Sequence, residues 1–366
     1  MAAAAILGIS PELVIHPGET ISDILEERNL TQKELAQRAG VSEAFLSDVI
    51  HGKKDISKGL AMGLEYALGV PSSFWLNLQA NYDAELISLQ EETTIQKEER
   101  QILTTLHEVV DYLKKIASIP NDATQEQTIL GLRKVLQISN LTVLQNLAPS
   151  GAFRMSEKAK VDPFVLGAWL CLCKVQSSLK QFANGFDPRK VNELILRLKD
   201  IMCSRRGDLQ QALISLFAEY GIDFSIVRNF RGAPVQGYID FKEDGSYQMV
   251  VTIRGAYADI FWFSLFHELG HIVNGDIAKP GRFSDTEAPQ NAKREEEANR
   301  FARDALLDPA DYRAFIDRGR FTLPLIQDFA KTQNVPPYVV IGRLQREERI
   351  PYSWYNKYKT KYKWAE

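Results

Sequence analysis

Two histidines and a glutamate in the stretch FSLFHELGHIVNG, residues 263–275, have the spacing of a metal site. His267 and His271 are four residues apart, and Glu268 directly follows the first. Residues i and i+4 of a helix share one face about 6 Å apart, so both imidazoles can bind one ion. Glu268 can then take the proton of a water that the metal activates. This H-E-x-x-H spacing is typical of zinc peptidases.

A buried structural helix is the alternative interpretation of the same stretch. The surrounding segment DIFWFSLFHELGHIV is largely apolar, and the chain has only five histidines. Buried histidines and acids need hydrogen-bond partners, which makes two histidines and a glutamate costly in a plain core helix. The metal site is therefore favoured. We expect Gly270, between the two histidines, to leave the helix surface open to a substrate backbone.

The third ligand should be a carboxylate, because no histidine follows His271 and such a site needs three protein ligands. The stretch KREEEANRFARDALL offers three successive glutamates. Helical phase favours Glu295, which shares the apolar face of Ala298, over Glu296 and Glu297, which are rotated towards the charged face. The sequence thus predicts one Zn²⁺ ion bound by the two histidines and Glu295.

Two further polar residues bear on this site. Asn299, one helical turn after Glu295, is expected to orient a ligand histidine from behind. Asp276, five residues after His271, is a rival third ligand. Glu296 and Glu297 also remain alternatives at this stage.

An N-terminal stretch, TQKELAQRAGVSEAFLSDVIHGKKDIS, has the form of a helix-turn-helix. Thr31 and Glu34 have the spacing of a capping box, and Gly40 marks the turn. The second helix of such a unit places its first residues in the major groove of double-stranded DNA. The expected base contacts are Ser42, Glu43, Ala44 and Ser47, and the expected phosphate contacts are Gln32, Lys33, Lys53 and Lys54.

The charge near this unit supports modest DNA affinity. Residues 31–58 carry five basic and four acidic side chains, a net charge of +1. The wider range 11–90 carries six basic and twelve acidic side chains, a net charge of −6. We expect operator binding to be salt-sensitive and helped by dimerisation. A helical bundle that contacts only protein is the alternative.

The whole chain is predicted to be mainly α with a small antiparallel β-sheet. The strands are expected in IDFSIVRNF, QGYIDF and YQMVVTI. The expected parts are a helix-turn-helix domain over 10–83, a long helix or coiled-coil arm over 84–117, a linker over 118–125, a helical middle region over 126–218, a zincin-like metallopeptidase core over 219–309, and a C-terminal helical region and tail over 310–366.

Bulk composition limits the function classes. A net charge of −3 over 366 residues excludes a polyanion binder by bulk charge. No apolar run is long enough for a membrane span, and the start MAAAAILGIS lacks the basic region of a signal peptide. Three cysteines fit a reducing cytoplasm, with Cys171 and Cys173 as core residues rather than metal ligands.

The C-terminal tail YSWYNKYKTKYKW alternates lysine with other residues. Such alternation is typical of one solvated face of a terminal strand. Basic residues interspersed with aromatics can also bind nucleic acid, which is the alternative interpretation.

The HELGH stretch and EEEANRFARDALLDP together resemble the ImmA/IrrE family of zinc metallopeptidases over about residues 205–345. The resemblance implies a cytoplasmic bacterial or phage protein with a zinc site and cleavage of a repressor-like partner. One departure is the run IVNGD after HELGH, where many members have a further histidine. The residues that carry the match in the second stretch are Glu295, Ala298, Asn299, Phe301, Ala302, Leu306, Leu307 and Pro309.

The N-terminal region resembles the XRE/Cro-type domain of HigA-like antitoxins over about residues 10–90. The stretches IHGKKDIS and FWLNLQANYDAEL carry this likeness together with residues 16–42. It implies operator binding as a homodimer, autorepression and a cognate toxin as partner. The combined expectation is a DNA-binding regulator whose zinc peptidase domain cleaves a regulatory protein. The alternative is a non-catalytic repressor or antitoxin whose metal domain senses a ligand or docks a partner.

Overall fold

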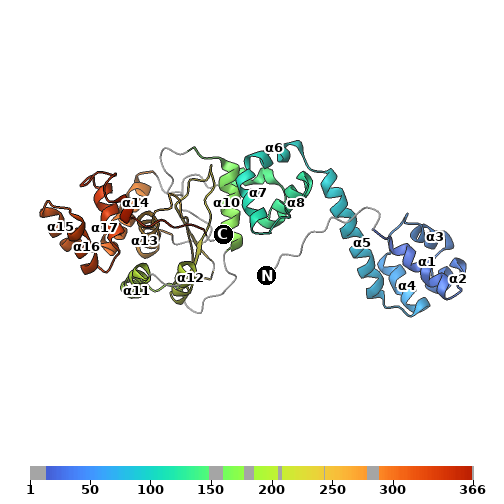
Figure 1. Cartoon of the computed structure of the whole chain (residues 1–366). Coiled ribbons are helices and arrows are strands. Elements are labelled where there is room, and N and C mark those ends of the chain that lie inside the picture. The colour runs from blue at the N-terminus through green and yellow to red at the C-terminus, as the bar shows by residue number, and fades with distance from the viewer. Residues whose placement is uncertain are drawn as a thin grey trace. The chain divides into compact units, whose positions relative to one another are not determined.

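The computed structural model describes residues 14–147, 160–176, 185–204, 208–242, 244–277 and 288–364. The chain divides into two compact units, one of Met1–Gln101 with Leu113–Gly131, and one of Ile102–Tyr112 with Leu132–Glu366. The described residues are mainly helical and include one small sheet, as predicted (Figure 1). None of the described helices has the length and apolar character needed to cross a membrane. The stretch considered as a signal peptide lies outside the described residues.

Four short helices form the N-terminal bundle: α1 (Pro17–Glu27), α2 (Gln32–Ala39), α3 (Glu43–Ile50) and α4 (Lys58–Leu68). The Thr31 hydroxyl accepts a hydrogen bond from the Glu34 N–H at 3.2 Å, and the Ser42 hydroxyl accepts one from the Phe45 N–H at 3.1 Å. These are the predicted N-caps of α2 and α3. The Glu34 carboxylate pairs with Arg38.

Close helix contacts hold this bundle together. A methyl group at Gly63 of α4 would overlap the Ala39 carbonyl oxygen at the end of α2. Gly40 then turns the chain with a φ of 70°, a left-handed conformation that favours glycine. The helices enclose a core of fully buried side chains, to which Trp75 of the next helix also belongs. The core includes Ile21, Leu35, Leu46, Val49 and Leu64.

Three helices replace the single long helix predicted over residues 84–117. Helix α5 (Ser72–Thr93) ends where the Thr94 hydroxyl donates to the Glu91 carbonyl, and α6 (Lys97–Thr105) and α7 (His107–Lys115) follow. The prediction of one long helix is wrong because the chain breaks between these three helices, and five of the apolar positions are buried within the chain's own fold. Those positions are Ile95, Ile102, Leu106, Val109 and Leu113. Residues 116–124 connect α7 to α8 (Gln125–Leu136).

The second unit contains a three-stranded sheet with the strand order β1-β3-β2. Strand β1 (Ile222–Ile226) pairs in parallel with β3 (Tyr247–Val251), and β2 (Gly237–Phe241) pairs antiparallel with β3. The prediction of an antiparallel sheet is therefore wrong for β1. A short connection joins β2 to the adjacent strand β3. The longer connection over 227–236 joins β1 to β2, which are not neighbours, because β3 lies between them in the sheet.

Helices cover both faces of this sheet (Figure 1). The face that includes Ile239 and Met249 packs in the main core with α13 (Ala258–Asn274). On the opposite face, the Gln248 amide donates to the Cys173 carbonyl of α10 (Pro163–Gln176) at 2.6 Å. Cys171 and Cys173 are buried in α10, and burial raises the pKa of both thiols, as expected of core cysteines.

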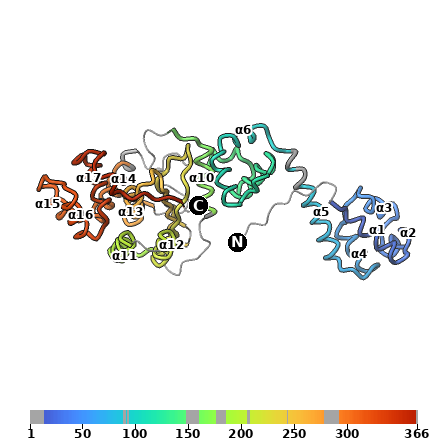
Figure 2. Tube along the Cα trace, viewed as in Figure 1, coloured from blue at the N-terminus to red at the C-terminus, as the bar shows by residue number. Residues whose placement is uncertain are grey.

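The remaining helices complete the second unit. They are α9 (Leu144–Leu147), α11 (Val191–Cys203), α12 (Leu209–Glu219), α14 (Ala288–Leu306), α15 (Pro309–Asp317), α16 (Leu323–Thr332) and α17 (Pro337–Arg346). After α17 the C-terminal segment, dark red in Figure 2, returns to the start of α13, where the Tyr362 N–H donates to the Ala256 carbonyl at 2.7 Å.

Candidate metal centre and nucleic-acid interface

Helices α13 and α14 pack side by side and together carry the candidate metal ligands. Gly270 of α13 allows this approach, because a methyl group there would lie 3.1 Å from the Phe301 ring and 3.2 Å from the Ala298 Cα. The expectation that Gly270 leaves the surface open to a substrate is therefore wrong. Its missing side chain makes room for α14, which brings Glu295 to the histidines.

The ligand atoms of His267, His271 and Glu295 converge. The two Nε2 atoms are 3.1 Å apart, and each lies 3.3–3.4 Å from a carboxylate oxygen of Glu295. Among the described residues, this is the only group of three potential ligands, all within 4.8 Å of one another. Two imidazole nitrogens and one carboxylate oxygen suit a divalent transition metal. The donor set and its spacing thus fit a bound metal ion.

A second set of polar groups holds the imidazoles from behind. The Asn299 amide oxygen lies 3.1 Å from Nδ1 of His267, and the Asp276 carboxylate lies 2.7 Å from Nδ1 of His271. Asp276 also lies 3.7 Å from the Arg294 guanidinium. An acceptor at Nδ1 fixes the ring so that the lone pair of Nε2 points towards the convergence point.

The cluster shifts the pKa values of its members in opposite directions. Burial alone would lower the pKa of His271, but hydrogen bonds to Asp276 and Glu295 and the nearby charge of Glu268 raise it to about 10. Burial alone would raise the pKa of Glu295, but hydrogen bonds to both histidines hold it well below its ordinary value. Without a metal the carboxylate is ionised and His271 is protonated at neutral pH.

Glu268 is 4% exposed and lies against the start of strand β2. A methyl group at Gly237 would overlap its carboxylate, so any larger residue at this position would force the Glu268 side chain to move. The side chain of Glu268 thus occupies a defined place beside the ligand histidines. Our sequence interpretation missed Gly237, although a glycine at the start of a strand often marks a close approach.

The three alternatives for the third ligand, Glu296, Glu297 and Asp276, do not lie with their carboxylates at the point where the histidine Nε2 atoms converge. Glu296 is exposed and pairs with Arg303 at 2.7 Å, and neither it nor Glu297 belongs to the ligand group. Asp276 contacts His271 at Nδ1, the nitrogen that faces away from the cluster. The sequence offered Asp276 only as a rival ligand and missed its contact with Nδ1.

The predicted DNA-contacting residues lie on and around α3. Glu43 and Ala44 are exposed in the first turn of α3, Ser42 caps it, and Ser47 is half-buried with its carbonyl 2.7 Å from Nδ1 of His51. Lys33 and Lys53 are exposed, and Gln32 is partly so. Lys54 forms an ion pair with Asp48 at 2.8 Å and lies over the Phe45 ring.

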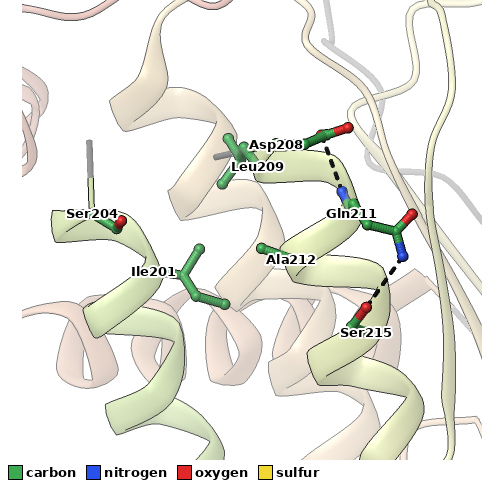
Figure 3. Close-up of a pocket in the computed structure, with 7 residues that line it drawn as sticks. All are labelled: Ile201, Ser204, Asp208, Leu209, Gln211, Ala212 and Ser215. Carbon is green, nitrogen blue, oxygen red and sulfur yellow. Dashed lines mark hydrogen bonds between the residues drawn. The ribbon is translucent and has the colours of Figure 1, made fainter. Parts of the chain in front are cut away.

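A separate pocket of about 320 Å³ lies between α11 and α12 (Figure 3). It shares no residue with the metal cluster. Polar residues that line the pocket form hydrogen bonds with one another. The Asp208 carboxylate accepts from the Gln211 N–H, and the Gln211 side-chain amide donates to the Ser215 hydroxyl at 3.2 Å. The lining residues are Ile201, Ser204, Asp208, Leu209, Gln211, Ala212 and Ser215.

Two family models match separate parts of the chain. A helix-turn-helix model matches residues 21–75, and a model of the IrrE N-terminal-like domain matches residues 258–344. These matches confirm a helix-turn-helix domain near the N-terminus and an IrrE-like domain towards the C-terminus. The second matched range contains all three candidate ligands and Glu268.

Two named proteins are similar to a part of this chain. Virulence-associated protein A' of Dichelobacter nodosus is 37% identical over 76 residues, which are 20% of this chain and 66% of that protein. The uncharacterised helix-turn-helix regulator YddM of Escherichia coli K12 is 30% identical over 63 residues, 17% of this chain and 67% of that protein. This chain thus spans about two thirds of the length of each.

A solved structure is also similar. A protein assigned as an antidote of a plasmid maintenance system in Nostoc punctiforme is 36% identical, and the match covers 24% of this chain and 93% of that one with a TM-score of 0.21.

Proposed function

This chain belongs to the helix-turn-helix proteins through residues 21–75, and it carries an IrrE N-terminal-like domain over residues 258–344. From these two assignments we propose that it is a DNA-binding transcriptional regulator with a zinc-dependent peptidase domain. The peptidase would hydrolyse a peptide bond in a regulatory protein. Operator binding would place its action in the bacterial cytoplasm.

The spacing of the three ligand atoms is the observation that carries the peptidase proposal. Tetrahedral Zn²⁺ with bonds of roughly 2.1 Å places its ligand atoms about 3.4 Å apart. The Nε2 atoms of His267 and His271 are 3.1 Å apart, and they lie 3.3 and 3.4 Å from Oε2 and Oε1 of Glu295, respectively. Two histidines and one carboxylate are also the ligand set of catalytic zinc sites, which leave a fourth position open.

The chain's own residues support hydrolysis around such an ion. Bound zinc would supply a Lewis acid that lowers the pKa of a water molecule and polarises a peptide carbonyl. Glu268 would take the proton of that water on its carboxylate and deliver it to the leaving amide nitrogen. Its burial against Gly237 supports this role, since a fixed carboxylate needs little reorganisation during proton transfer.

Solvent-exposed residues at the start of α3 support the DNA-binding part of the proposal. Glu43 and Ala44 are exposed at its start, where base contacts are expected, and Lys33 and Lys53 are exposed nearby. Lys54 is already engaged by Asp48, so it should contribute less to phosphate binding than the other two lysines. Double-stranded operator DNA is thus the proposed partner of this domain.

Exposed apolar side chains on the N-terminal bundle support a protein partner as well. Met62 and Tyr66 lie one turn apart on α4 and are 45% and 77% exposed. We propose that this surface forms the interface of a homodimer or contacts a cognate toxin, as expected of a HigA-like antitoxin. A dimer would double the DNA contacts and offset the modest charge of each copy.

The peptidase proposal is tested by mapping new protein N-termini in cells that express the wild type, Glu268→Gln or Glu296→Gln. Cleavage should appear with the wild type and with the exposed-site control Glu296→Gln, and disappear with Glu268→Gln. The variant Glu268→Gln should keep its metal, because all three ligands remain. Identical N-termini with the wild type and Glu268→Gln, under resting and stressed conditions, would contradict a peptidase function.

A second candidate function is a non-catalytic repressor or antitoxin in which the metal domain senses a ligand or docks a partner. The exposed Met62 and Tyr66 favour it, because they offer a partner surface outside the metal domain. In that case Glu268→Gln should leave operator repression unchanged, whereas Tyr66→Ala should weaken dimerisation or toxin binding. Gel filtration and a reporter assay with both variants separate the two functions.

A further inference from the structure

Three large aromatic side chains are exposed after helix α17. Tyr352 is 61%, Trp354 is 50% and Tyr358 is 38% exposed. They follow one another within seven residues and lie beyond residues 258–344, so the IrrE-type domain match does not account for them. Exposed tryptophan and tyrosine at this density are uncommon on a surface that contacts only water.

The loop that carries these aromatics is firmly held. The buried Gln345 amide donates to the carbonyls of Tyr352 and Trp354 at 3.2 and 2.8 Å. Tyr355 adopts a φ of 60°, a strained conformation for a bulky residue, and its hydroxyl donates to the Phe321 carbonyl at 3.0 Å. Such strain persists only when surrounding contacts enforce it. The protein therefore fixes the backbone that presents Tyr352 and Trp354.

The same segment is strongly basic. Residues 349–364 contain five basic side chains and no acidic one. Lys359 is neutralised by a buried ion pair with Asp259 at 2.6 Å, which also anchors the segment to α13. Four exposed cations remain: Arg349, Lys357, Lys361 and Lys363. Lys357 lies 5.2 Å from the centre of the Tyr358 ring, so a cation and a flat ring lie side by side.

We propose that residues 349–364 form a second nucleic-acid-binding surface, which takes single-stranded DNA or RNA. Unstacked bases would stack on Tyr352, Trp354 and Tyr358, while Arg349, Lys357 and Lys361 contact phosphates. Base faces stack on exposed aromatic rings only where they are free of their neighbours, which favours a single strand over a duplex. This surface is independent of the metal cluster and of the helix-turn-helix.

Charge favours nucleic acid over a protein contact at this surface. A protein interface with Trp and Tyr at its centre usually carries few charged residues there. Here four exposed cations lie in the same short segment as the aromatics, with no acid among residues 349–364. A polyanion with flat, stackable groups matches both features.

Fluorescence anisotropy of a labelled 16-nucleotide oligo(dT) with the full-length protein tests this proposal. Replacing Tyr352 and Trp354 with alanine should weaken binding by about tenfold or more, because each stacked base contributes strongly. The matched control Leu196→Ala removes an apolar side chain that is 61% exposed on α11, as exposed as Tyr352, and should leave oligo(dT) binding unchanged. Neutralising Lys357 and Lys361 with glutamine should lower the slope of log affinity against log salt by about 0.7 for each phosphate group that is no longer neutralised.

Two further measurements separate this surface from the other parts of the chain. The double variant Lys33→Gln/Lys53→Gln should weaken binding to duplex DNA and leave oligo(dT) binding unchanged. Trp354→Ala should weaken oligo(dT) binding and leave duplex binding unchanged. Circular dichroism and metal content establish that each variant is folded.

Failure of the wild type to bind oligo(dT), or an equal reduction of affinity in Leu196→Ala and Tyr352→Ala/Trp354→Ala, would overturn the proposal. So would an absence of oligo(dT) binding in the Lys33/Lys53 variant, which would assign that binding to the helix-turn-helix. A change of molar mass in the Tyr352/Trp354 variant without any effect on oligo(dT) binding would also overturn it and identify a protein interface.

Discussion

The carboxylate of Asp276 lies 2.7 Å from Nδ1 of His271, although Asp276 stands outside the helix that carries the histidine. Helix α13 ends at Asn274. The next residue, Gly275, caps it with a φ of 70° that reverses the chain, and the Asp276 N–H donates to the His271 carbonyl at 3.1 Å. A single left-handed glycine thus returns the next side chain to the last histidine of the motif.

We predict that Asp276→Asn weakens metal binding without unfolding the protein. The amide can still accept a hydrogen bond from Nδ1, but it lacks the charge that makes the imidazole a stronger ligand. Removal of such a partner typically weakens metal affinity by about 10- to 100-fold. Competition with a chromophoric chelator measures the change. Asp304→Asn, an exposed acid on α14, should bind metal as the wild type does, and equal affinity of Asp276→Asn and wild type would contradict the role of Asp276.

The choice of Glu295 as third ligand predicts different results for neighbouring glutamates. Glu295→Gln should lose most of its bound metal, because a neutral amide is a poor ligand and the two histidines alone leave the site incomplete. Glu296→Gln and Glu297→Gln should retain it, since neither side chain reaches the cluster. Metal content after extensive dialysis distinguishes them. Full occupancy in Glu295→Gln would exclude this residue as a ligand.

The raised pKa of His271 predicts opposite pH trends for metal binding and for the stability of the metal-free protein. The imidazole is protonated below a pKa of about 10, and metal binding must displace that proton. Affinity should therefore rise by about tenfold per pH unit from pH 6 to 8. Glu295 adds no slope there, because its pKa is held well below its ordinary value.

The stability of the metal-free protein should instead decrease as pH rises. A histidine whose pKa is raised on folding stabilises the folded state below its unfolded pKa of about 6.5, and that contribution disappears as pH rises towards the folded pKa. Urea unfolding of chelator-treated protein at pH 6 and pH 8 measures this decrease. Metal affinity that does not change between those two pH values would show that His271 is already neutral.

Gly237→Ala should strain the protein at Glu268. The added methyl group overlaps the buried carboxylate, and overpacking of this kind costs about 1–3 kcal/mol of stability. The cost should fall sharply in a Glu268→Ala background, where the overlapping side chain is absent, and a double-mutant cycle measures the coupling. Gly59→Ala on the open surface of α4 is the control for a glycine substitution without a clash. Additive effects of Gly237→Ala and Glu268→Ala would contradict this contact.

Local sequence determined several features of this protein. Spacing placed His267 and His271 on one helix face, helical phase separated Glu295 from Glu296 and Glu297, and Thr31 and Ser42 marked helix starts by their capping chemistry. These are short-range properties, because helical periodicity and capping depend on residues within one or two turns.

Only the tertiary structure decided the features that depend on distant segments. The predicted long helix became α5, α6 and α7, with Ile95, Ile102 and Leu106 buried, an outcome that helical periodicity alone does not specify. The sheet became mixed because β3 lies between β1 and β2, which strand patterns do not specify.

The same distinction holds at the metal cluster. Sequence spacing brought the two histidines together, but the close approach of α13 and α14 at Gly270 brought Glu295 to them. The turn at Gly275 made Asp276 a partner of His271 at Nδ1, and the missing side chain of Gly237 in strand β2 leaves room for the Glu268 carboxylate. Contacts between residues far apart in the chain depend on how whole elements pack, and periodicity within one element carries no information about that packing.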